Sequence, residues 1–491
     1  MKSFPEKVQV CIIGAGPAGL CAALRLLAMG YHVGMIESEK FPRQQIGESL
    51  SPGIRGIFKY LDAELLLDDD RFLRQMPSNI IWENKESSFQ SPKNKNGNIV
   101  VDRSILDQEL LKLAVSRGLH LLQPGKLSST QRSELGWKLQ VQTEAGKIQI
   151  QAEIVLDARG RKGSLVKDRV SISPSMVAIW AQIPANLMPE ESFVEAIHEG
   201  WFWGAKVPGN RYRVMAFTDG TTIQRNNIRH LYQLAKNTKF FAGIAEELRS
   251  LPIETCSVTS YVHQNPWNEQ FIKLGEAAFT LDPLSSSGVE KAMRFSLQTA
   301  IAVNTYFKNP GSLYPKDYYE EKFIESVSNH AHWTASFYRE AWPYKECAPF
   351  WKNKSKVQCI QPANGSAFIE RLCKELQTTN DNQENKMPVT IPIDLVLNQI
   401  RSDNISLSPL IRFKEMYAVR EDCIEVMMAV CHPQLERPVG YLEQLDLKML
   451  LAEIDGKTIE GAIESVSRNI SMERAKKIIV HLWQKQLILV N

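Results

Sequence analysis

Three glycines near the amino terminus have the spacing that a dinucleotide phosphate site requires. Gly14, Gly16 and Gly19 form the pattern G-x-G-x-x-G. Glycines at these positions permit a tight turn and a close approach of the backbone to a pyrophosphate, and the following helix directs N–H groups and a positive dipole end at the phosphates. Glu37 comes 23 positions after Gly14, close to the ~20 positions expected for an acid that binds a ribose hydroxyl. A glycine turn that only packs is the alternative, but it would not require the acid.

The elements that would hold this turn follow the order strand, helix, strand. Val8 to Ile13 is a short apolar run, and the apolar residues from Leu20 to Leu27 have a helical spacing that ends near Gly30. Tyr31 to Ile36 predicts the second strand, which ends at Glu37. The start of the chain therefore predicts a βαβ unit that binds a dinucleotide. This pattern alone leaves NAD and FAD open.

Downstream patterns predict a second domain and then a return to the first. Residues 41–125 are punctuated by glycine and proline and predict loops that contact a ligand. Short alternating and aromatic runs between residues 174 and 263 are typical of sheet strands that cover a substrate. The expected elements are a helix over Ile105–Ala114, a strand over Ile154–Leu156, strands over Met176–Ile183 and Arg211–Phe217, and a strand-turn-helix over Ala277–Arg294.

The last hundred residues predict a small helical module. Amphipathic patterns predict helices over Leu442–Ile454 and Thr458–Val466, and Ser471 predicts the N-cap of a third. This arrangement is winged-helix-like. Residues 441–491 contain seven Lys/Arg and seven Asp/Glu. That balance disfavours DNA binding, so we expect packing or docking.

The composition excludes several classes of protein. The 491 residues carry 58 basic and 55 acidic side chains. The net charge is therefore too small to attract nucleic acid or a membrane surface. The eight cysteines have no C-x-x-C spacing, so we expect reduced thiols, no disulfide framework and no metal site. The amino terminus predicts no signal peptide, and no run is apolar enough to span a membrane. A cytoplasmic protein is expected.

Several motifs together resemble the flavin-dependent halogenases and their monooxygenase relatives, over about residues 8–345. The resemblance implies FAD and an α/β fold. That fold has a Rossmann-type FAD-binding domain, a p-hydroxybenzoate hydroxylase-like substrate sheet and the small winged-helix-like domain. The motifs are residues 14–19 (GAGPAG), 41–50 (FPRQQIGESL), 101–103 (VDR), 157–160 (DARG) and 282–288 (DPLSSSG). The expected boundaries are 1–170 and 266–375 for the FAD domain, 171–265 for the sheet domain, 376–390 for a linker and 391–491 for a docking domain.

The resemblance also implies which residues hold FAD. Arg103 is expected to reach its phosphates, and Asp282 its ribityl or pyrophosphate region. Ser286, Ser287 and Gly288 would direct N–H groups at the isoalloxazine from a helix start. Glu276 stands where the family usually has Gly-Asp. The expected set is Gly14, Gly16, Ala18, Gly19, Glu37, Arg43, Ser49, Arg103, Asp157, Asp282, Ser286, Ser287 and Gly288.

One position bears on halogenation against hydroxylation. The halogenases that this chain resembles have Lys-x-Gly-x-x-Phe-x-Trp, and the matching stretch here, residues 75–82, begins with Gln75. An amide is neither cationic nor nucleophilic, so it cannot capture hypohalous acid as an ammonium can. In another register, Lys85 would take that role. The family's Trp-x-Trp-x-Ile-Pro is also extended here, over Trp201–Pro208. We expect Trp201 and Trp203 to pack.

The remaining pattern resembles flavoprotein monooxygenases that hydroxylate a peptidyl tryptophan in tryptophylquinone biogenesis, including the one that serves quinohemoprotein amine dehydrogenase. Residues 330–338 (HAHWTASFY) carry this part of the resemblance. It implies oxygen transfer from a flavin C4a-hydroperoxide, with water excluded. Glu48 is the candidate general base for the ring proton and Gln75 a candidate orienting group; a structural acceptor and a surface residue are their alternatives.

The expected partners are a protein or peptide that carries the target tryptophan, O₂, and a separate flavin reductase or NADH, because no second nucleotide motif is found. Neither nucleic acid nor a membrane is expected. Three alternatives remain open: a flavin-dependent halogenase of an indole, phenol or pyrrole, a flavin-binding protein that docks peptides with little turnover, and a reductase of unsaturated lipids.

Overall fold

A computed structural model describes most of the chain, which divides into two compact units. Unit 1 comprises Met1–Asn304 and Tyr319–Asn380, and unit 2 comprises Thr305–Tyr318 and Asp381–Asn491. The described residues are 4–83, 86–91, 97–221, 227–341, 348–359, 365–378, 403–435 and 437–490. Most of the expected linker, from residue 379 to 390, lies outside them.

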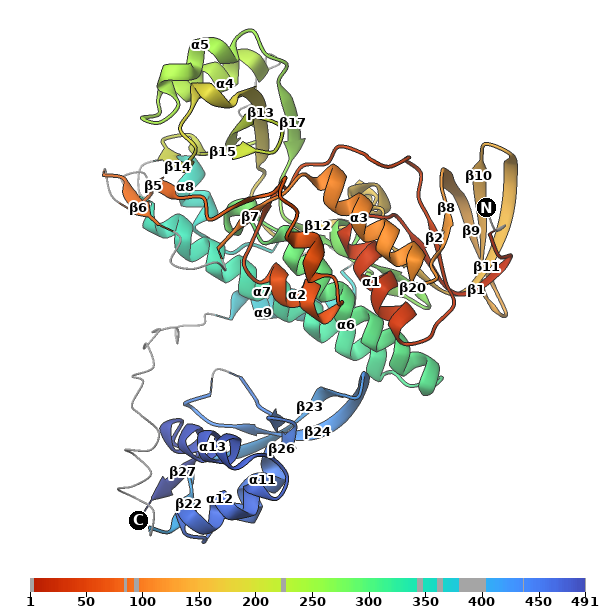
Figure 1. Cartoon of the computed structure of the whole chain (residues 1–491), viewed down its shortest axis with the longest axis vertical. Helices are drawn as coiled ribbons and strands as arrows, with labels where there is room; N and C mark the ends of the chain where they lie inside the picture. Colours follow the sequence, from red (N-terminus) through yellow and green to blue (C-terminus); the bar gives the residue numbers. More distant parts are fainter. Residues whose placement is uncertain are drawn as a thin grey trace. The chain divides into compact units, whose positions relative to one another are not determined.

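The first sheet of unit 1 contains the predicted βαβ unit (Figure 1). Strands β1 (Lys7–Ile13) and β2 (Val33–Ile36) are parallel, and α1 (Pro17–Ala28) connects them. The apolar residues of β1 and α1 are buried almost completely, which is why the pattern could be read from the sequence. The main path of the sheet runs β19-β20-β11-β1-β2-β8, and β9 and β10 extend it from β11. These strands are β8 (His120–Leu122), β9 (Gly125–Ser133), β10 (Gly136–Thr143), β11 (Gly146–Asp157), β19 (Trp267–Asn268) and β20 (Phe271–Lys273).

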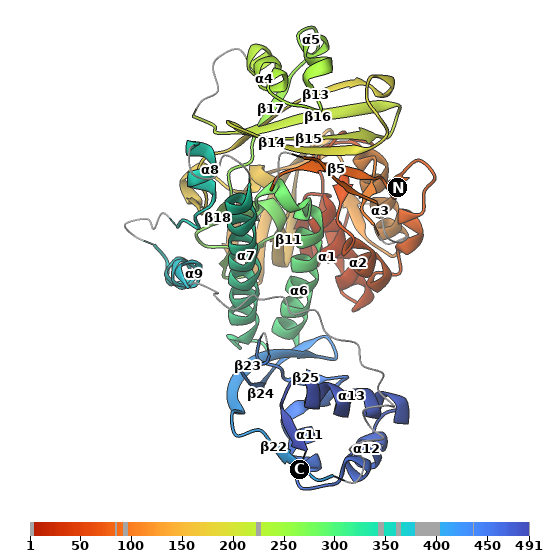
Figure 2. The same cartoon turned by 90° about the vertical axis from the view of Figure 1, so that its left-hand side faces the viewer.

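The second sheet of unit 1 has two apolar faces. Its seven strands have the order β17-β13-β16-β15-β14-β5-β6. Helices α4 (Asn227–Lys236) and α5 (Ala245–Leu248) cover one face (Figure 2). Side chains of α7 (Tyr314–Glu340) and α8 (Pro349–Lys354) pack against the other. The strands are β5 (Ser78–Ile81), β6 (Ser88–Gln90), β13 (Val177–Pro184), β14 (Ser192–Ile197), β15 (Gly200–Val207), β16 (Arg211–Thr218) and β17 (Glu254–Ser257).

Smaller elements complete unit 1. Strand β3 (Ser49–Leu50) pairs with β7 (Ile99–Val100), which also pairs with β4 (Leu73–Arg74). The strand-turn-helix predicted over Ala277–Arg294 corresponds to β21 followed by α6 (Gly288–Lys308). The remaining elements are α2 (Ile54–Tyr60), α3 (Arg103–Ser116), α9 (Ala367–Gln377), β12 (Arg169–Ser171), β18 (Tyr261–His263) and β21 (Phe279–Thr280).

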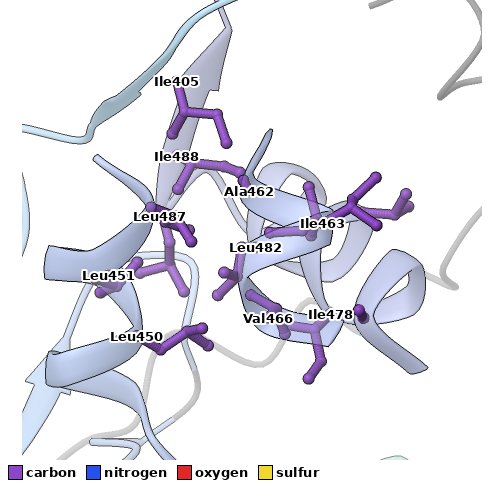
Figure 3. Packing of buried hydrophobic residues seen from close by; sticks show 14 of the residues in the cluster. Ile405, Leu450, Leu451, Ala462, Ile463, Val466, Ile478, Leu482, Leu487 and Ile488 are labelled. Atoms are coloured by element: carbon purple, nitrogen blue, oxygen red, sulfur yellow. The ribbon is translucent and has the colours of Figure 1, made fainter. Parts of the chain in front are cut away.

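Unit 2 has its own apolar core, in which three helices enclose aliphatic side chains (Figure 3). The helices are α11 (Leu447–Ile454), α12 (Ile459–Ser467) and α13 (Met472–Gln484). Ser471 is the N-cap of α13, as predicted. The strand pairs are β22 (Ile405–Leu407) with β27 (Ile488–Val490), β23 (Arg412–Arg420) with β24 (Cys423–Cys431), and β25 (Tyr441–Leu442) with β26 (Leu445–Asp446).

Two sequence predictions are corrected here. The helix predicted to begin at Leu442 begins only at Leu447, because Glu443 and Gln444 form a left-handed turn at φ 50° and 69° and Asp446 caps the helix. The expectation of reduced cysteines is also wrong for one pair. Cys359 and Cys373 form a disulfide, with Cα atoms 5.6 Å apart. Cys347 lies outside the described residues.

No helix within the described ranges is both long and apolar enough to cross a membrane.

Candidate functional site

The glycine turn lies between β1 and α1 in the predicted geometry. Gly14 has φ +105°, and a Cβ there would lie 2.5 Å from the carbonyl oxygen of Ala158. A Cβ on Gly19 would lie 2.1 Å from the carbonyl oxygen of Gly14. Neither position therefore accepts a side chain, and the N-terminus of α1 stays close to the turn.

The predicted acid borders this turn. Glu37 follows β2 and is buried. Its carboxylate accepts the N–H of Ala15 at 2.7 Å and that of Glu39 at 2.8 Å. The acid and the turn are therefore joined by a hydrogen bond, and a contact between Glu37 and a ribose stays a prediction.

Arg43 supplies the cation that a pyrophosphate would need. Its Nη2 lies 3.9 Å from where a Cβ of Gly16 would stand and 3.9 Å from Glu37 Oε2. The Arg43 Nε is buried and has no hydrogen-bond partner among the described residues. A buried donor of this kind is costly unless it is satisfied. An unsatisfied guanidinium N–H beside the backbone of Gly16, at the start of α1, fits a bound pyrophosphate.

The start of α6 lies beside the start of α1. A Cβ on Gly275 would lie 3.0 Å from the Cβ of Ala18 and 3.7 Å from that of Ala292. Residues 46–53 adjoin α6 as well, because Ser51 Oγ donates to Glu290 Oε2 at 2.5 Å. The glycine turn, the 46–53 loop and the first turn of α6 are thus linked by contacts and bound one region.

The loop before α6 leaves its helix terminus open. Ser286 has a left-handed φ of 51°, and Ser285 and Ser287 join their hydroxyls at 2.5 Å. Apart from its chain neighbours and the nearby backbone of α6, no described atom lies within 4 Å of where a Cβ of Gly288 would stand. The first N–H groups of a helix have no intrahelical acceptor. This geometry fits a flavin ring beside residues 286–288.

Two residues expected to contact FAD are occupied by the protein itself. Arg103 donates to both carboxylate oxygens of Asp107 at 2.8 Å and to the carbonyl oxygen of Ile46 at 3.1 Å, so it supports the 46–53 loop. Asp157 is fully buried and binds Arg159 at 2.8 Å and Lys273 at 3.3 Å. The geometry gives both a supporting role, and their contacts to FAD stay predictions. Ser49 begins β3 and pairs with Val100 in β7.

Glu48 ties the 46–53 loop to the second sheet. Its Oε1 lies 2.6 Å from Arg213 Nη2 of β16, and its Oε2 accepts the N–H of Gly47 at 3.0 Å. Both partners of the ion pair are buried. Burial lowers the pKa of the Arg213 guanidinium, and Glu48 opposes this effect. Both carboxylate oxygens of Glu48 have partners, which suits a structural acceptor better than a free base.

Gln75 and Glu48, the two candidate catalytic residues, do not meet. Gln75 is exposed in a left-handed turn, at φ 57°, between β4 and β5. Strands β3 and β4 flank β7 with Ser49 in register with Leu73. Glu48 precedes β3 and Gln75 follows β4, so β7 lies between the two strands that they flank. No hydrogen bond or ion pair joins the two residues in the described part of the chain. Lys85, the other candidate, lies outside the described residues.

Tryptophans line the sheet face that packs against α7 and α8. Trp201 stacks on Phe217 with ring centroids 3.9 Å apart and donates its N–H to the Tyr338 hydroxyl at 3.2 Å. Trp201 therefore packs, as expected. Trp203 is half-buried and lies opposite Met215 of β16. In residues 330–338, Trp333 is exposed on α7.

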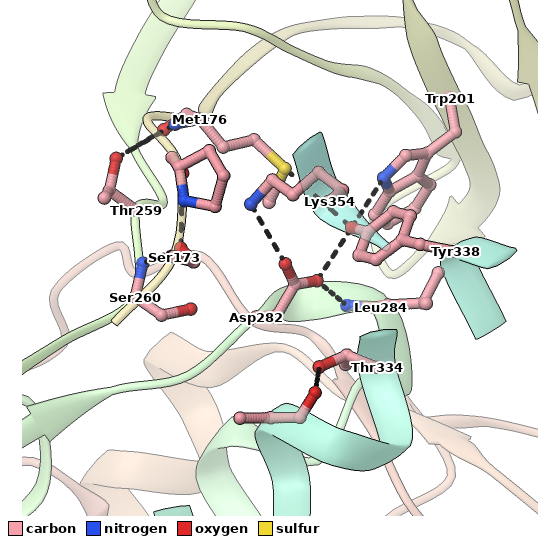
Figure 4. A network of polar contacts seen from close by, with 12 residues as sticks. Ser173, Met176, Trp201, Thr259, Ser260, Asp282, Leu284, Thr334, Tyr338 and Lys354 are labelled. Carbon is pink, nitrogen blue, oxygen red and sulfur yellow. Dashed lines mark hydrogen bonds and ion pairs between the residues drawn. The ribbon is translucent and has the colours of Figure 1, made fainter. Parts of the chain in front are cut away.

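Asp282 lies in a buried polar network (Figure 4). Its carboxylate accepts the Tyr338 hydroxyl at 2.9 Å and is 3.3 Å from Lys354 Nζ. The carboxylate thus binds α7 and α8, and its contact with the ribityl or pyrophosphate region of FAD stays a prediction. Gly275, seven residues earlier, is the part of this segment that meets α1. Its neighbour Glu276 pairs with Arg161 at 3.2 Å.

Sequence reasoning missed Lys354 and Arg213, and it assigned no role to Tyr338, the last residue of the 330–338 motif. Each of the three comes from an element far along the chain from its partner. Only the folded arrangement brings Lys354 to Asp282 and Arg213 to Glu48.

Comparisons with known proteins agree with this geometry. Residues 9–167 match the FAD dependent oxidoreductase family. The putative FAD-dependent oxidoreductase LodB of Marinomonas mediterranea is 24% identical over 73% of this chain and 100% of its own. A tryptophan 2-halogenase of Chondromyces crocatus is 26% identical over 62% of each chain.

Two solved structures share the fold over nearly the whole chain. QhpG, a peptidyl tryptophan dihydroxylase essential for tryptophylquinone cofactor biogenesis, has a TM-score of 0.71 at 18% identity and covers 98% of this chain and 100% of its own. The flavin-dependent halogenase CmlS has a TM-score of 0.67 at 18% identity and covers 99% of this chain and 96% of its own. The chain is thus a flavoprotein enzyme that carries an FAD-dependent oxidoreductase domain, takes FAD as its cofactor and has flavin-dependent halogenases among its homologues.

Proposed function

We propose that the protein is an FAD-dependent monooxygenase that hydroxylates the ring of a peptidyl tryptophan during tryptophylquinone biogenesis. The fold shared with QhpG, which extends through unit 2, supports this proposal. CmlS shares that extent, so the choice between oxygen and halogen transfer depends on the site.

The choice between oxygen and halogen transfer depends on whether a free lysine ammonium is available at the site. The position that matches the halogenase lysine is Gln75, which is exposed. Among the described residues, Lys354 is the lysine that is buried, and Asp282 holds it; Lys291 on α6 is only half-buried. An ammonium committed to a carboxylate in the interior is a poor acceptor of electrophilic halogen, since it must first lose a proton and its partner. Oxygen transfer needs neither step.

The chain's own residues would prepare the site in three ways. The glycine turn and Arg43 would hold the pyrophosphate, and the N–H groups before α6 would face the flavin ring. The aromatic sheet face would exclude water and provide apolar contacts for an indole. FAD, when bound and reduced, supplies the activation of dioxygen.

The decisive experiment offers oxygen and halogen transfer at once. The FAD-loaded protein, NADH, a flavin reductase, O₂ and bromide are incubated with a ten-residue peptide that has a central tryptophan, or with free tryptophan. We expect mass spectrometry to find added oxygen on the peptide and little reaction of free tryptophan. Bromine on either substrate, without added oxygen, would contradict the proposal.

A halogenase remains the second candidate, because halogenases are among the relatives in sequence and in fold. If bromine is found on a substrate, the variants Lys85→Ala and Gln75→Ala show which of the two positions corresponds to the halogenase lysine. Loss of bromination in the first variant alone would assign Lys85 as the halogenating ammonium.

The supply of electrons and the cellular setting are part of the same proposal. We expect a separate reductase or NADH to reduce the flavin, and a cytoplasmic substrate protein that meets the enzyme through unit 2. If the gene for this protein lies among genes for a tryptophylquinone enzyme, that location would support the proposed function.

A further inference from the structure

A buried lysine binds the loop that leads into α6. Lys354 ends the short helix α8 and is 5% exposed. Its Nζ lies 3.3 Å from Asp282 Oδ2, and Asp282 is 7% exposed. Burial lowers the pKa of Lys354, while Asp282 raises it. A buried ammonium needs such a partner to stay charged.

The same carboxylate organises the loop. Asp282 Oδ1 accepts the Tyr338 hydroxyl at 2.9 Å and the N–H of Leu284 at 3.2 Å. His330 Nε2 lies 3.0 Å from the Asp282 carbonyl oxygen. Since a carbonyl only accepts, the ring nitrogen donates. The side chain and the carbonyl of one residue are therefore fixed by three elements: α8, α7 and the loop itself (Figure 4).

The network borders a cavity lined in part by Ser260, His330 and Lys354. The buried carboxylate of Asp282 is bonded to other protein groups. Its effect on the active site therefore passes through the loop.

We propose that Lys354 is a positioning residue. Its ion pair with Asp282 holds residues 282–288 in place, so that the open N–H groups at the start of α6 face the flavin. This role rests on the proposed FAD site and is the same in a hydroxylase and in a halogenase. Stability alone gives a weak reason for such a pair, because apolar residues of similar volume often replace a buried ion pair without loss.

The test separates positioning from stability. FAD affinity of the apoprotein, the absorption spectrum of bound FAD and the unfolding midpoint are measured for Lys354→Met and for Asp282→Leu/Lys354→Met. In the single variant a lone buried carboxylate remains, and we expect a lower midpoint and at least tenfold weaker FAD binding. In the double variant we expect a midpoint near that of the wild type, but FAD binding still at least tenfold weaker and a changed spectrum.

The matched control is Lys352→Met, an exposed lysine on the same helix, which should leave all three measurements unchanged. A double variant with wild-type FAD affinity and spectrum would overturn the proposal. If Lys354→Met and the double variant do not fold, Tyr338→Phe decides. It removes the hydroxyl that donates to Asp282 and accepts the Trp201 N–H, and we expect at least threefold weaker FAD binding. Unchanged binding and spectrum in Tyr338→Phe would then overturn it.

Discussion

At the scale of single residues, Arg43 illustrates how an unsatisfied donor indicates a ligand. Its buried Nε lacks a protein partner among the described residues, and its Nη2 faces Gly16. A hydrogen bond to a charged group contributes about 1.5–3 kcal/mol. We therefore expect Arg43→Ala to weaken FAD binding by roughly 10- to 100-fold, measured by the quenching of flavin fluorescence. Arg132→Ala, at an exposed ion pair, is the control, and an equal loss there would contradict this role.

Glu48 permits a second test at this scale. Glu48→Gln leaves Arg213 as an unpaired buried cation, which should cost about 3–5 kcal/mol of unfolding free energy. Glu48→Met/Arg213→Met removes both charges and should recover most of that loss, as denaturant titration would show. If Glu48→Gln abolishes turnover but leaves stability unchanged, Glu48 is the general base that the sequence first indicated and the structural role is wrong.

Which residues could be foreseen depended on the range of their contacts. Gly14, Gly19 and Glu37 act within one βαβ unit, where spacing along the chain sets spacing in space. Arg213, Tyr338 and Lys354 meet their partners across 165, 56 and 72 positions, and no local pattern encodes such contacts. For Asp157 and Asp282, which the sequence indicated as FAD contacts, the cations Arg159, Lys273 and Lys354 that pair with them could not be foreseen.

At the scale of elements, the N-cap of α13 offers a local test. Ser471 Oγ accepts the N–H of Arg474 at 3.4 Å. Ser471→Ala should destabilise this helix by about 1 kcal/mol, seen as faster hydrogen exchange of the α13 amides in the whole protein. Ser467→Ala serves as the comparison, because that hydroxyl bonds only to a carbonyl of its own helix. Equal exchange in the two variants would contradict the cap.

Elements were foreseen where an apolar period repeats. Most residues of helix α1 and strand β1 are buried, so their apolar residues gave clear helix and strand patterns in the sequence. The short strands β5 and β6, within a segment expected to be loops, did not. Strand β5 is held by its pairing with β14, a contact across more than a hundred positions, and among the described strands β6 pairs only with β5. The turn before α11 escaped notice because Leu442 and Leu445 fit a helical period.

At the scale of the whole molecule, buried histidines make stability depend on pH. Burial lowers the pKa of both His263 and His330 from 6.5 to about 4. The unfolded chain therefore binds more protons between these values, and stability present above pH 6.5 is lost as the pH falls towards 4. Each histidine accounts for up to about 3 kcal/mol.

The measurement is the unfolding free energy from pH 7 to pH 4, in the wild type and in His330→Gln, which keeps an N–H donor near Asp282 but does not titrate in this range. We expect a shallower fall in the variant. Parallel curves would show that His330 is not the source.

The composition of unit 2 has a practical consequence for dissecting the protein. The unit includes Thr305–Tyr318, where the Ile424 N–H donates to Thr305 Oγ1 at 2.9 Å and the Tyr417 hydroxyl donates to Asp317 at 3.2 Å. A fragment that starts at residue 391 would lack these acceptors, and a chain that stops at 390 would keep them with no donors. Truncation at one peptide bond thus damages both halves, and a loss of turnover after it would say nothing about substrate docking. Point substitutions within residues 403–490 are the sounder way to ask what unit 2 recognises.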